Sequence, residues 1–424
     1  MSLNLTVANN SGSVSFNNNI RPISTNVYRG SLGNKGDKGN KKDPELYLQP
    51  NEENHDAIQL WLNRVFKRIN VWWGRIFNIE PIAYTAGLES EWEQGYRGGV
   101  LLQNNEILMV PHNNANTRAF NPETKTFRTI NTHGKGLGAF SGGLYLNSGG
   151  ILLIPYNSPS ICIAVPDISF IFSGDHNLET PTPHFDGGVL LPNGWSCLIP
   201  AKANQVGLVN TLNSTSTEYI NTGPKFKPVG DSNQYSGGVL LLDGRVLMVP
   251  HGNPYLRIYN PIKNIFDIIS KIPLEISNVD KSFSGGVLGR NGIVYMAPYN
   301  AQKIGIYNPI TNEWTVSSEA DDLSTSKYTG GVLLRNGNIL FIPHNKGHYL
   351  EYNPETYISI THNISPIGGT IDHNAEGKYY GGIVTENGSV CVIPHSSNHI
   401  DLIDINDSNI MDKNVSQSPF FNKF

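Results

Sequence analysis

Six histidines occupy repeated positions in this chain and are its first candidates for chemistry. Four directly follow a proline, and the other two share a later loop position: His112, His251, His344 and His395, then His348 and His399. Converging imidazoles bind zinc, copper or nickel, and the spacing would bring His344, His348, His395 and His399 to one face. No cysteine or carboxylate accompanies them at a fixed spacing, however. We therefore expect no metal and no cofactor. The six are candidate binding residues, or repeat residues that bond a neighbouring loop.

The histidines recur because the chain contains seven copies of one unit. Each copy starts with an aromatic residue, a small residue and Gly-Gly, and a proline follows 13 residues after the first glycine. The double glycines begin at Gly98, Gly142, Gly187, Gly237, Gly285, Gly330 and Gly381. They are expected to be structural, because glycine permits close backbone packing where the repeats would crowd together around a common axis.

Each unit has the pattern of four short strands. Val239 to Leu242 and Val246 to Val249 flank Asp243-Gly244, which predicts a hairpin with a type I′ turn and positive φ at both central residues. A third run ends at Asn260-Pro261, and a fourth run follows in most copies. Four strands in roughly 47 residues are typical of a propeller blade. The sequence predicts an all-β, seven-bladed β-propeller, with an open solenoid as the alternative.

The ends of the repeat region predict how the ring closes. The seventh unit has only the polar residues 407–413 where its fourth strand belongs, whereas Ile82 to Ala86 precedes the first unit at the spacing of a fourth strand. An N-terminal strand should therefore complete the last blade and remove a free sheet edge. Length varies between the fourth strand of one unit and the first strand of the next. The face with these connections and the Pro-His segments is the predicted binding face.

The runs GRVLMVPH…LRIYNP and IVYMAPY…IGIYNPITNEW resemble kelch-type blades in their apolar run, their Tyr-Asn-Pro and their trailing Trp. The resemblance extends from Ile82 to about Asp404. Kelch units, however, end their second strand in Gly-Gly, whereas this chain has Pro-His or Pro-Tyr there. The resemblance implies a propeller fold and leaves function open.

Four segments follow from these patterns: a polar arm at 1–53, an amphipathic helix at 54–80, the propeller at 81–406 and a tail at 407–424. Apolar residues recur at helical spacing in the second segment. We expect partner-anchoring contacts from Trp61, Ile69, Trp72 and Trp73. The alternatives are a helix that packs on the ring itself and a helix on a membrane surface.

Within the arm, Gly30, Gly33, Gly36 and Gly39 stand at every third position, as in collagen. A flexible linker is the plain interpretation. The segment also resembles short stretches of bacteriophage tail-fibre and other appendage proteins.

Composition limits the partners. A net charge of −4 with 16% charged residues argues against a nucleic-acid partner. The N-terminus lacks the pattern of a secretory leader, and no run reaches the length of a membrane span. Cys162, Cys197 and Cys391 fall within apolar runs and are expected to be buried thiols.

No catalytic motif is found, so the sequence predicts that the protein is not an enzyme. The leading hypothesis is a structural or binding component of a virus particle, a bacteriophage tail, fibre or head appendage. Its arm would bind other virion proteins or form a homo-oligomer, and its propeller would bind a protein or glycan. The alternative is a cytoplasmic, kelch-like protein- or glycan-binding module of a cell. A third hypothesis is an enzyme on a propeller scaffold, which rests on the versatility of the fold alone.

Overall fold

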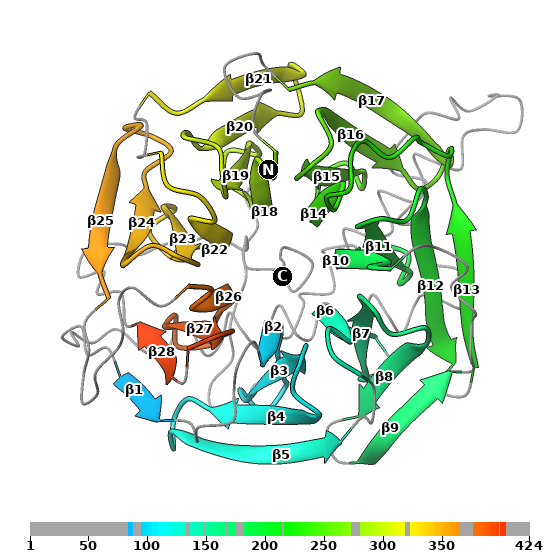
Figure 1. The fold of residues 1–424 in the computed structure, drawn as a ribbon, viewed down its shortest axis with the longest axis vertical. Helices are drawn as coiled ribbons and strands as arrows, with labels where there is room; N and C mark the ends of the chain where they lie inside the picture. The colour runs from blue at the N-terminus through cyan, green and yellow to red at the C-terminus, as the bar shows by residue number, and fades with distance from the viewer. Residues whose placement is uncertain are drawn as a thin grey trace, which may run out of the picture. The chain divides into compact units, whose positions relative to one another are not determined.

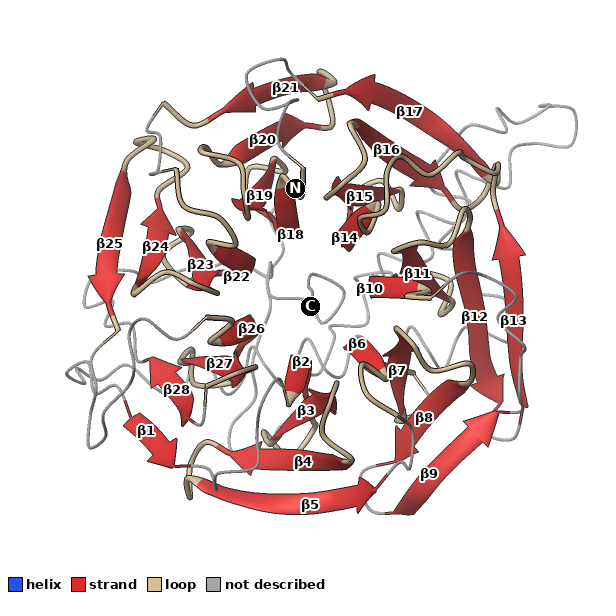
Figure 2. Ribbon diagram, viewed as in Figure 1, coloured by secondary structure: helices blue, strands red, loops and turns tan. Residues whose placement is uncertain are grey.

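The computed structural model describes residues 84–87, 95–132, 136–147, 149–165, 168–173, 182–213, 216–272, 280–318, 323–364, 376–397 and 399–403. These residues form seven four-stranded antiparallel sheets arranged as a ring (Figure 1). The predicted all-β, seven-bladed propeller is confirmed. No helix occurs among the described residues (Figure 2). The expected helix at 54–80 lies outside them, as do the whole of the arm at 1–53 and of the tail at 407–424.

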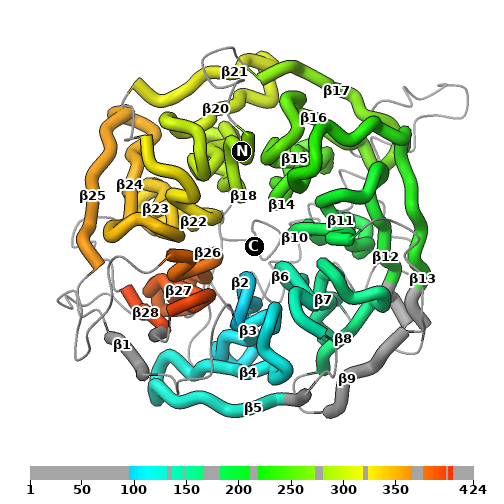
Figure 3. The backbone as a smooth tube through the Cα atoms, viewed as in Figure 1, coloured from blue at the N-terminus to red at the C-terminus, as the bar shows by residue number. Residues whose placement is uncertain are grey.

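In blades one to six the strands run outward from the axis in chain order, as the tube in Figure 3 shows. The innermost strands begin with the aromatic residue of the repeat: β2 (Tyr96–Leu101), β6 (Phe140–Tyr145), β10 (Phe185–Leu190), β14 (Tyr235–Leu240), β18 (Phe283–Leu288), β22 (Tyr328–Leu333) and β26 (Tyr379–Val384). The second strands end at the repeat proline: β3 (Ile107–Pro111), β7 (Ile151–Pro155), β11 (Ser196–Pro200), β15 (Val246–Pro250), β19 (Val294–Pro298), β23 (Ile339–Pro343) and β27 (Val390–Pro394).

The third strands are β4 (Asn116–Asn121), β8 (Ile161–Val165), β12 (Val206–Asn213), β16 (Tyr255–Asn260), β20 (Gly305–Asn308), β24 (His348–Tyr352) and β28 (His399–Ile403). The fourth strands of blades one to six are β5 (Thr126–Thr132), β9 (Ile168–Ser173), β13 (Ser216–Thr222), β17 (Ile265–Lys271), β21 (Glu313–Val316) and β25 (Ser359–Asn363). The fourth strands are more exposed than the inner ones, as in β17, β21 and β25.

The seventh blade takes its fourth strand from the N-terminal side. Strand β1 (Tyr84–Gly87) pairs antiparallel with β28, with Tyr84 opposite Leu402 and Gly87 opposite His399. This confirms the predicted ring closure, with the strand at Tyr84–Gly87 where Ile82 to Ala86 was expected. One sheet thus joins the two ends of the propeller.

Apolar side chains fill the spaces between blades. Seven buried clusters lie at the seven blade interfaces, and each combines residues from two neighbouring blades. The interface of blades seven and one, for example, contains Ile393 and Ile400 against Tyr96 and Met109. The second strands of all seven blades are buried from end to end.

Cys162, Cys197 and Cys391 are buried free thiols, as predicted.

The double glycine forms a β-bulge at the start of each innermost strand. In blade four, Tyr235 lies opposite Pro250 and Gly238 opposite Met248, so Ser236 and Gly237 together face one residue. Gly237 has a φ of 79°, which glycine adopts without strain. An added Cβ on Gly238 would lie 2.6 Å from Ile199 of the preceding blade. The same register shift occurs in every blade, so the first glycine bends the strand and the second admits a neighbour.

The hairpin turns differ from the predicted type I′. Gly244 donates its N–H to the carbonyl of Leu241, and only the glycine of the Asp-Gly pair has positive φ. This is a type I turn followed by a residue in the left-handed region. The side chain of Asp243 explains the choice, because its Oδ1 accepts the backbone N–H of Arg245 at 3.1 Å. The prediction of two positive φ values is therefore wrong.

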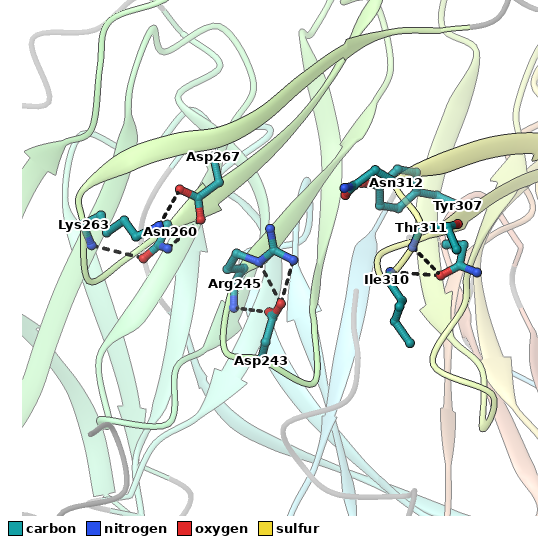
Figure 4. Close-up of polar contacts among 10 residues, drawn as sticks. Asp243, Arg245, Asn260, Lys263, Asp267, Tyr307, Ile310, Thr311 and Asn312 are labelled. Carbon is teal, nitrogen blue, oxygen red and sulfur yellow. Dashed lines mark hydrogen bonds and ion pairs between the residues drawn. The ribbon is translucent and has the colours of Figure 1, made fainter. Parts of the chain in front are cut away.

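The asparagine of the repeat Asn-Pro stabilises the turn between the third and fourth strands. This turn lies on the same face as the hairpin turn between the first and second strands. Asn260 Oδ1 accepts the backbone N–H groups of Ile262 and Lys263, and Figure 4 draws Asn260 with Lys263 and Asp267. Asn121, Asn308 and Asn353 cap their turns in the same way. We call this the turn face. The opposite side carries the loops between second and third strands and the connections between blades, and we call it the loop face.

Candidate functional site

Four repeat histidines link neighbouring blades on the loop face. Each follows the proline of a second strand, and its Nδ1 lies close to the carbonyl oxygen of the first-strand aromatic residue of the next blade. The pairs are His112 with Phe140 at 2.7 Å, His251 with Phe283 at 2.6 Å, His344 with Tyr379 at 3.0 Å, and His395 with Tyr96 at 2.9 Å. The last pair joins blade seven to blade one.

These bonds determine the protonation of the rings. A carbonyl can only accept, so Nδ1 carries the proton and Nε2 keeps its lone pair. Burial and the charge of Arg97 hold the pKa of His112 and His395 well below the usual value. Burial, with Arg97 and Lys378, lowers the pKa of His344 to about 4. At neutral pH these imidazoles are uncharged.

Three of these histidines meet near the axis. The ring centroid of His395 lies 5.8 Å from those of both His112 and His344. His251 instead contacts Tyr299 at 5.3 Å.

Of the two remaining candidates, the structure describes the side chain of His348 alone. His348 is the first residue of β24, where its Nε2 lies 3.0 Å from the hydroxyl of Tyr328. His399 is the first residue of β28, and its side chain is outside the described part. Within that part, no three His, Cys, Asp or Glu side chains are placed to hold a metal ion.

Arg97 lies beside this histidine group, at the start of the innermost strand of blade one. Its guanidinium carbon is 4.8 Å from the ring centre of Tyr380 and 5.1 Å from that of Tyr156. The buried Nε of Arg97 has no hydrogen-bond partner in the part of the chain that the structure describes. Cation–π contacts with Tyr156 and Tyr380 stabilise the charge of Arg97, together with a side-chain hydrogen bond to Tyr156 and the nearby charge of Asp186.

Asp186 occupies the equivalent position in blade three and is buried. Its carboxylate accepts the hydroxyl of Ser141 at 2.6 Å and that of Ser236 at 3.0 Å. The hydroxyl of Tyr380, from blade seven, lies 3.5 Å away. Hydrogen bonds between blades two, three, four and seven thus cross the axis. We call Arg97, Tyr156, Asp186 and Tyr380, with His112, His344 and His395, the axial cluster.

Sequence reasoning missed Arg97, Asp186 and Tyr380, although a signal was present. The residue before Gly-Gly is small in four repeats: Ser141, Ser236, Ser284 and Thr329. The other three repeats have a cation, an anion and a phenol there. This position is equivalent in all seven blades. The three repeats that do not have a small residue there therefore identify Arg97, Asp186 and Tyr380 as members of the axial cluster. The expected anchors Trp61, Ile69, Trp72 and Trp73 lie outside the described residues.

The chain resembles other propellers in fold. A streptogramin B lyase structure matches with a TM-score of 0.61 and 12% identity, over 77% of this chain and 98% of that one. A catalytically inactive histidine-to-alanine variant of virginiamycin B lyase from Staphylococcus aureus, with quinupristin, matches equally well over 77% and 100%. The WD40 propeller domain of Doa1 has a TM-score of 0.53 at 11% identity, over 77% and 98%. No family model and no curated protein matches the sequence.

These neighbours correct the expectation that the protein is not an enzyme. Lyases are among the structures that this chain resembles, so the fold itself supports catalysis. The absence of a familiar catalytic motif was not sufficient ground for that expectation, because a site in a propeller can be assembled from single residues of several blades. At this level of identity the likeness establishes the fold alone.

Among the described residues, no helix is long and apolar enough to cross a membrane.

Proposed function

We propose that this protein is a binding propeller that holds an anionic group of its ligand at the axial cluster. The observation that supports this most is the state of Arg97. Its guanidinium packs on two aromatic rings, and its Nε lacks a partner among the described residues. A buried donor without a partner costs about 1–3 kcal/mol. A ligand oxygen would remove that cost.

The neighbours of Arg97 favour an anion over a cation. Asp186 already accepts hydroxyl groups; its charge acts on Arg97 from a distance, but the two form no ion pair in the described part of the chain. Burial, and with it the positive charge of Arg97, lowers the pKa of His112, His344 and His395. Carboxylate, sulfate and phosphate groups suit such a site.

Inorganic phosphate tests this proposal. At constant ionic strength, phosphate should raise the Tm of the full chain in a saturable way, because a ligand that binds the folded state stabilises it. Arg97→Met should weaken the apparent affinity at least about tenfold, which equals roughly 1.4 kcal/mol. Arg97→Lys should retain part of the effect, and Arg245→Met on the turn face should retain all of it. Equal, unsaturable shifts in all variants would contradict the proposal.

The place where the protein acts remains a proposal from the sequence. The Gly triplets and the aromatic stripe favour a bacteriophage particle with the propeller displayed outward, and the kelch-like runs favour a cellular binding module. Purified particles on a density gradient separate the two. Co-migration of the protein with capsid protein supports the first, and its absence from the particle fraction supports the second.

A second candidate is lyase-type chemistry on the loop face. His344 favours it, because this partly exposed imidazole is neutral, has its Nδ1 fixed by Tyr379, and is close enough to Arg97 for that charge to lower its pKa. Quinupristin, the compound with the virginiamycin B lyase variant, is a direct probe. A new chromatographic product with wild type, absent with Arg97→Met and His344→Asn, would establish catalysis. Unchanged quinupristin would count against this substrate class.

A further inference from the structure

A pocket lies on the outer part of blade four, away from the axial cluster. It has a volume of about 480 Å³ and is lined by Lys227, Pro228, Val229, Gly230, Tyr255 and Arg257. The connection between β13 and β14 forms one wall, and the start of β16 forms the other. Small-molecule sites span about 300–1,000 Å³, so the pocket has room for more than an inorganic ion.

Arg257 is held rigidly at this pocket. Its Nε donates to the hydroxyl of Tyr235 at 2.7 Å. Its guanidinium carbon lies 5.0 Å from the ring centre of Phe226, 5.4 Å from that of Phe266 and 5.9 Å from that of Tyr255. A guanidinium has five N–H donors, and those of its two terminal nitrogens have no hydrogen-bond partner among the described residues. Arg257 is thus a fixed cation with unused donors.

The opposite wall is fixed as well. The buried amide of Gln234 holds Val229 from both sides: Oε1 accepts the N–H of Val229 at 2.7 Å, and Nε2 donates to its carbonyl at 3.0 Å. Asn253 donates to the same Oε1 at 3.0 Å. Phe226 anchors the start of the connection by an edge contact with Tyr235. A pocket with both walls fixed in advance loses little entropy when it binds.

The residues that line the pocket indicate the charge and shape of its ligand. Lys227 and Arg257 are cationic, and no acidic residue lines the pocket. Val229 and Tyr255 are 43% and 38% exposed, and together with Pro228 they provide an apolar surface. Arginine recognises carboxylates by paired hydrogen bonds, and an exposed tyrosine ring stacks on flat rings or on the C–H face of a sugar.

We propose that this pocket binds a small organic acid: a carboxylate on a ring-sized body that packs on Tyr255 and Val229. An acidic sugar and an aromatic acid share this chemistry. The site is independent of the axial cluster, because no residue belongs to both.

Titrations of the isotope-labelled full chain, followed by transverse-relaxation-optimised NMR, test the proposal. The probes are glucuronate and phenylacetate, with glucose, phenylacetamide and inorganic phosphate as controls. Either acid should give saturable shifts of the Val229 and Tyr255 amides, at least about tenfold tighter than its neutral analogue and than phosphate. Binding of glucuronate alone identifies a sugar site, and binding of phenylacetate alone identifies a site for aromatic acids.

Matched variants locate the site. Arg257→Met should weaken binding at least tenfold, and the surface changes Lys227→Ala and Tyr255→Ala should weaken it about threefold to tenfold without loss of folding. Arg245→Met and Tyr357→Ala, which alter an arginine and a tyrosine elsewhere, should leave it unchanged. Arg97→Met should also leave it unchanged, which separates this site from the axial one. Absence of saturable shifts with both acids, or equal binding of the neutral analogues, would overturn the proposal.

Discussion

Arg97, Asp186 and Tyr380 occupy a position that the other four blades give to serine or threonine. The register shift in each innermost strand turns this position toward the axis. Hydrogen bonds connect Ser141, Asp186, Ser236, Ser284 and Tyr380 at this position, so residue changes there alter the chemistry near the axis. The bulge that the glycines form is a precondition for this arrangement.

The first prediction concerns that bulge. Gly285 has a φ of 80°, a conformation that a β-branched residue adopts only with strain, so Gly285→Val should destabilise the protein by about 1–3 kcal/mol. Urea unfolding measures the effect. Gly347→Val is the control, because Gly347 has an ordinary φ and nothing within 4 Å of an added Cβ. Equal stability of the two variants would show that the bulge tolerates side chains.

The second prediction concerns pH. The folded pKa of His344 is about 4, below the value of about 6.5 for an unfolded chain. Between these values the unfolded state binds more protons, so stability is full above about pH 6.5 and is lost as the pH falls toward 4. The pKa shift corresponds to at most about 3 kcal/mol. The free energy of unfolding of wild type should decline over this range, and that of His344→Asn should decline less. Parallel curves would contradict this assignment.

At the scale of elements, the most important feature is β1, the strand that closes the ring. Strand β1 contributes the outer edge of blade seven, where it pairs through four residues with β28. The sequence predicted it, because the seventh unit lacks a fourth strand and one unassigned strand precedes the first unit. The turn type was not found, because Asp-Gly is compatible with two hairpin geometries, and only the side-chain bond of Asp243 decides between them.

The third prediction follows from this closure. Deleting residues 1–87 removes β1 and exposes the edge of β28, which should cost about 2–4 kcal/mol at roughly 1 kcal/mol for each lost hydrogen bond. Denaturant midpoints measure the loss. Deletion of residues 1–80 is the matched control because it keeps β1. If both truncated chains unfold at the same midpoint, the pairing contributes nothing to stability.

At the scale of the whole molecule, the repeat made the architecture predictable and left the sites hidden. Invariant spacing in seven copies defines blades, whereas ligand sites depend on residues that differ between copies. Arg97 belongs to one such set. Arg257 belongs to another, and its pocket also needs the long connection before Tyr235, one of the variable insertions on the predicted binding face. Tertiary contacts such as those of Gln234 with Val229 leave no periodic trace.

The fourth prediction concerns the role of the arm. If Trp61, Ile69, Trp72 and Trp73 anchor the protein to a partner, removing residues 1–80 should leave a monomeric propeller with nearly unchanged Tm. The full chain should then oligomerise, which sedimentation equilibrium detects. A large fall in Tm on this truncation, with a monomeric full chain, would place the helical segment within the fold.

The pairing of β1 with β28 also has a consequence for the order of events during synthesis. About 310 residues separate the two strands along the chain, and ribosomes add about 5–20 residues per second. For roughly 15–60 seconds β1 therefore has no native partner, while the first six blades emerge and stack. Nascent chains need a means to keep this strand from pairing elsewhere. The four residues Tyr84–Gly87 are short enough to bind weakly to wrong edges and to be released when blade seven arrives.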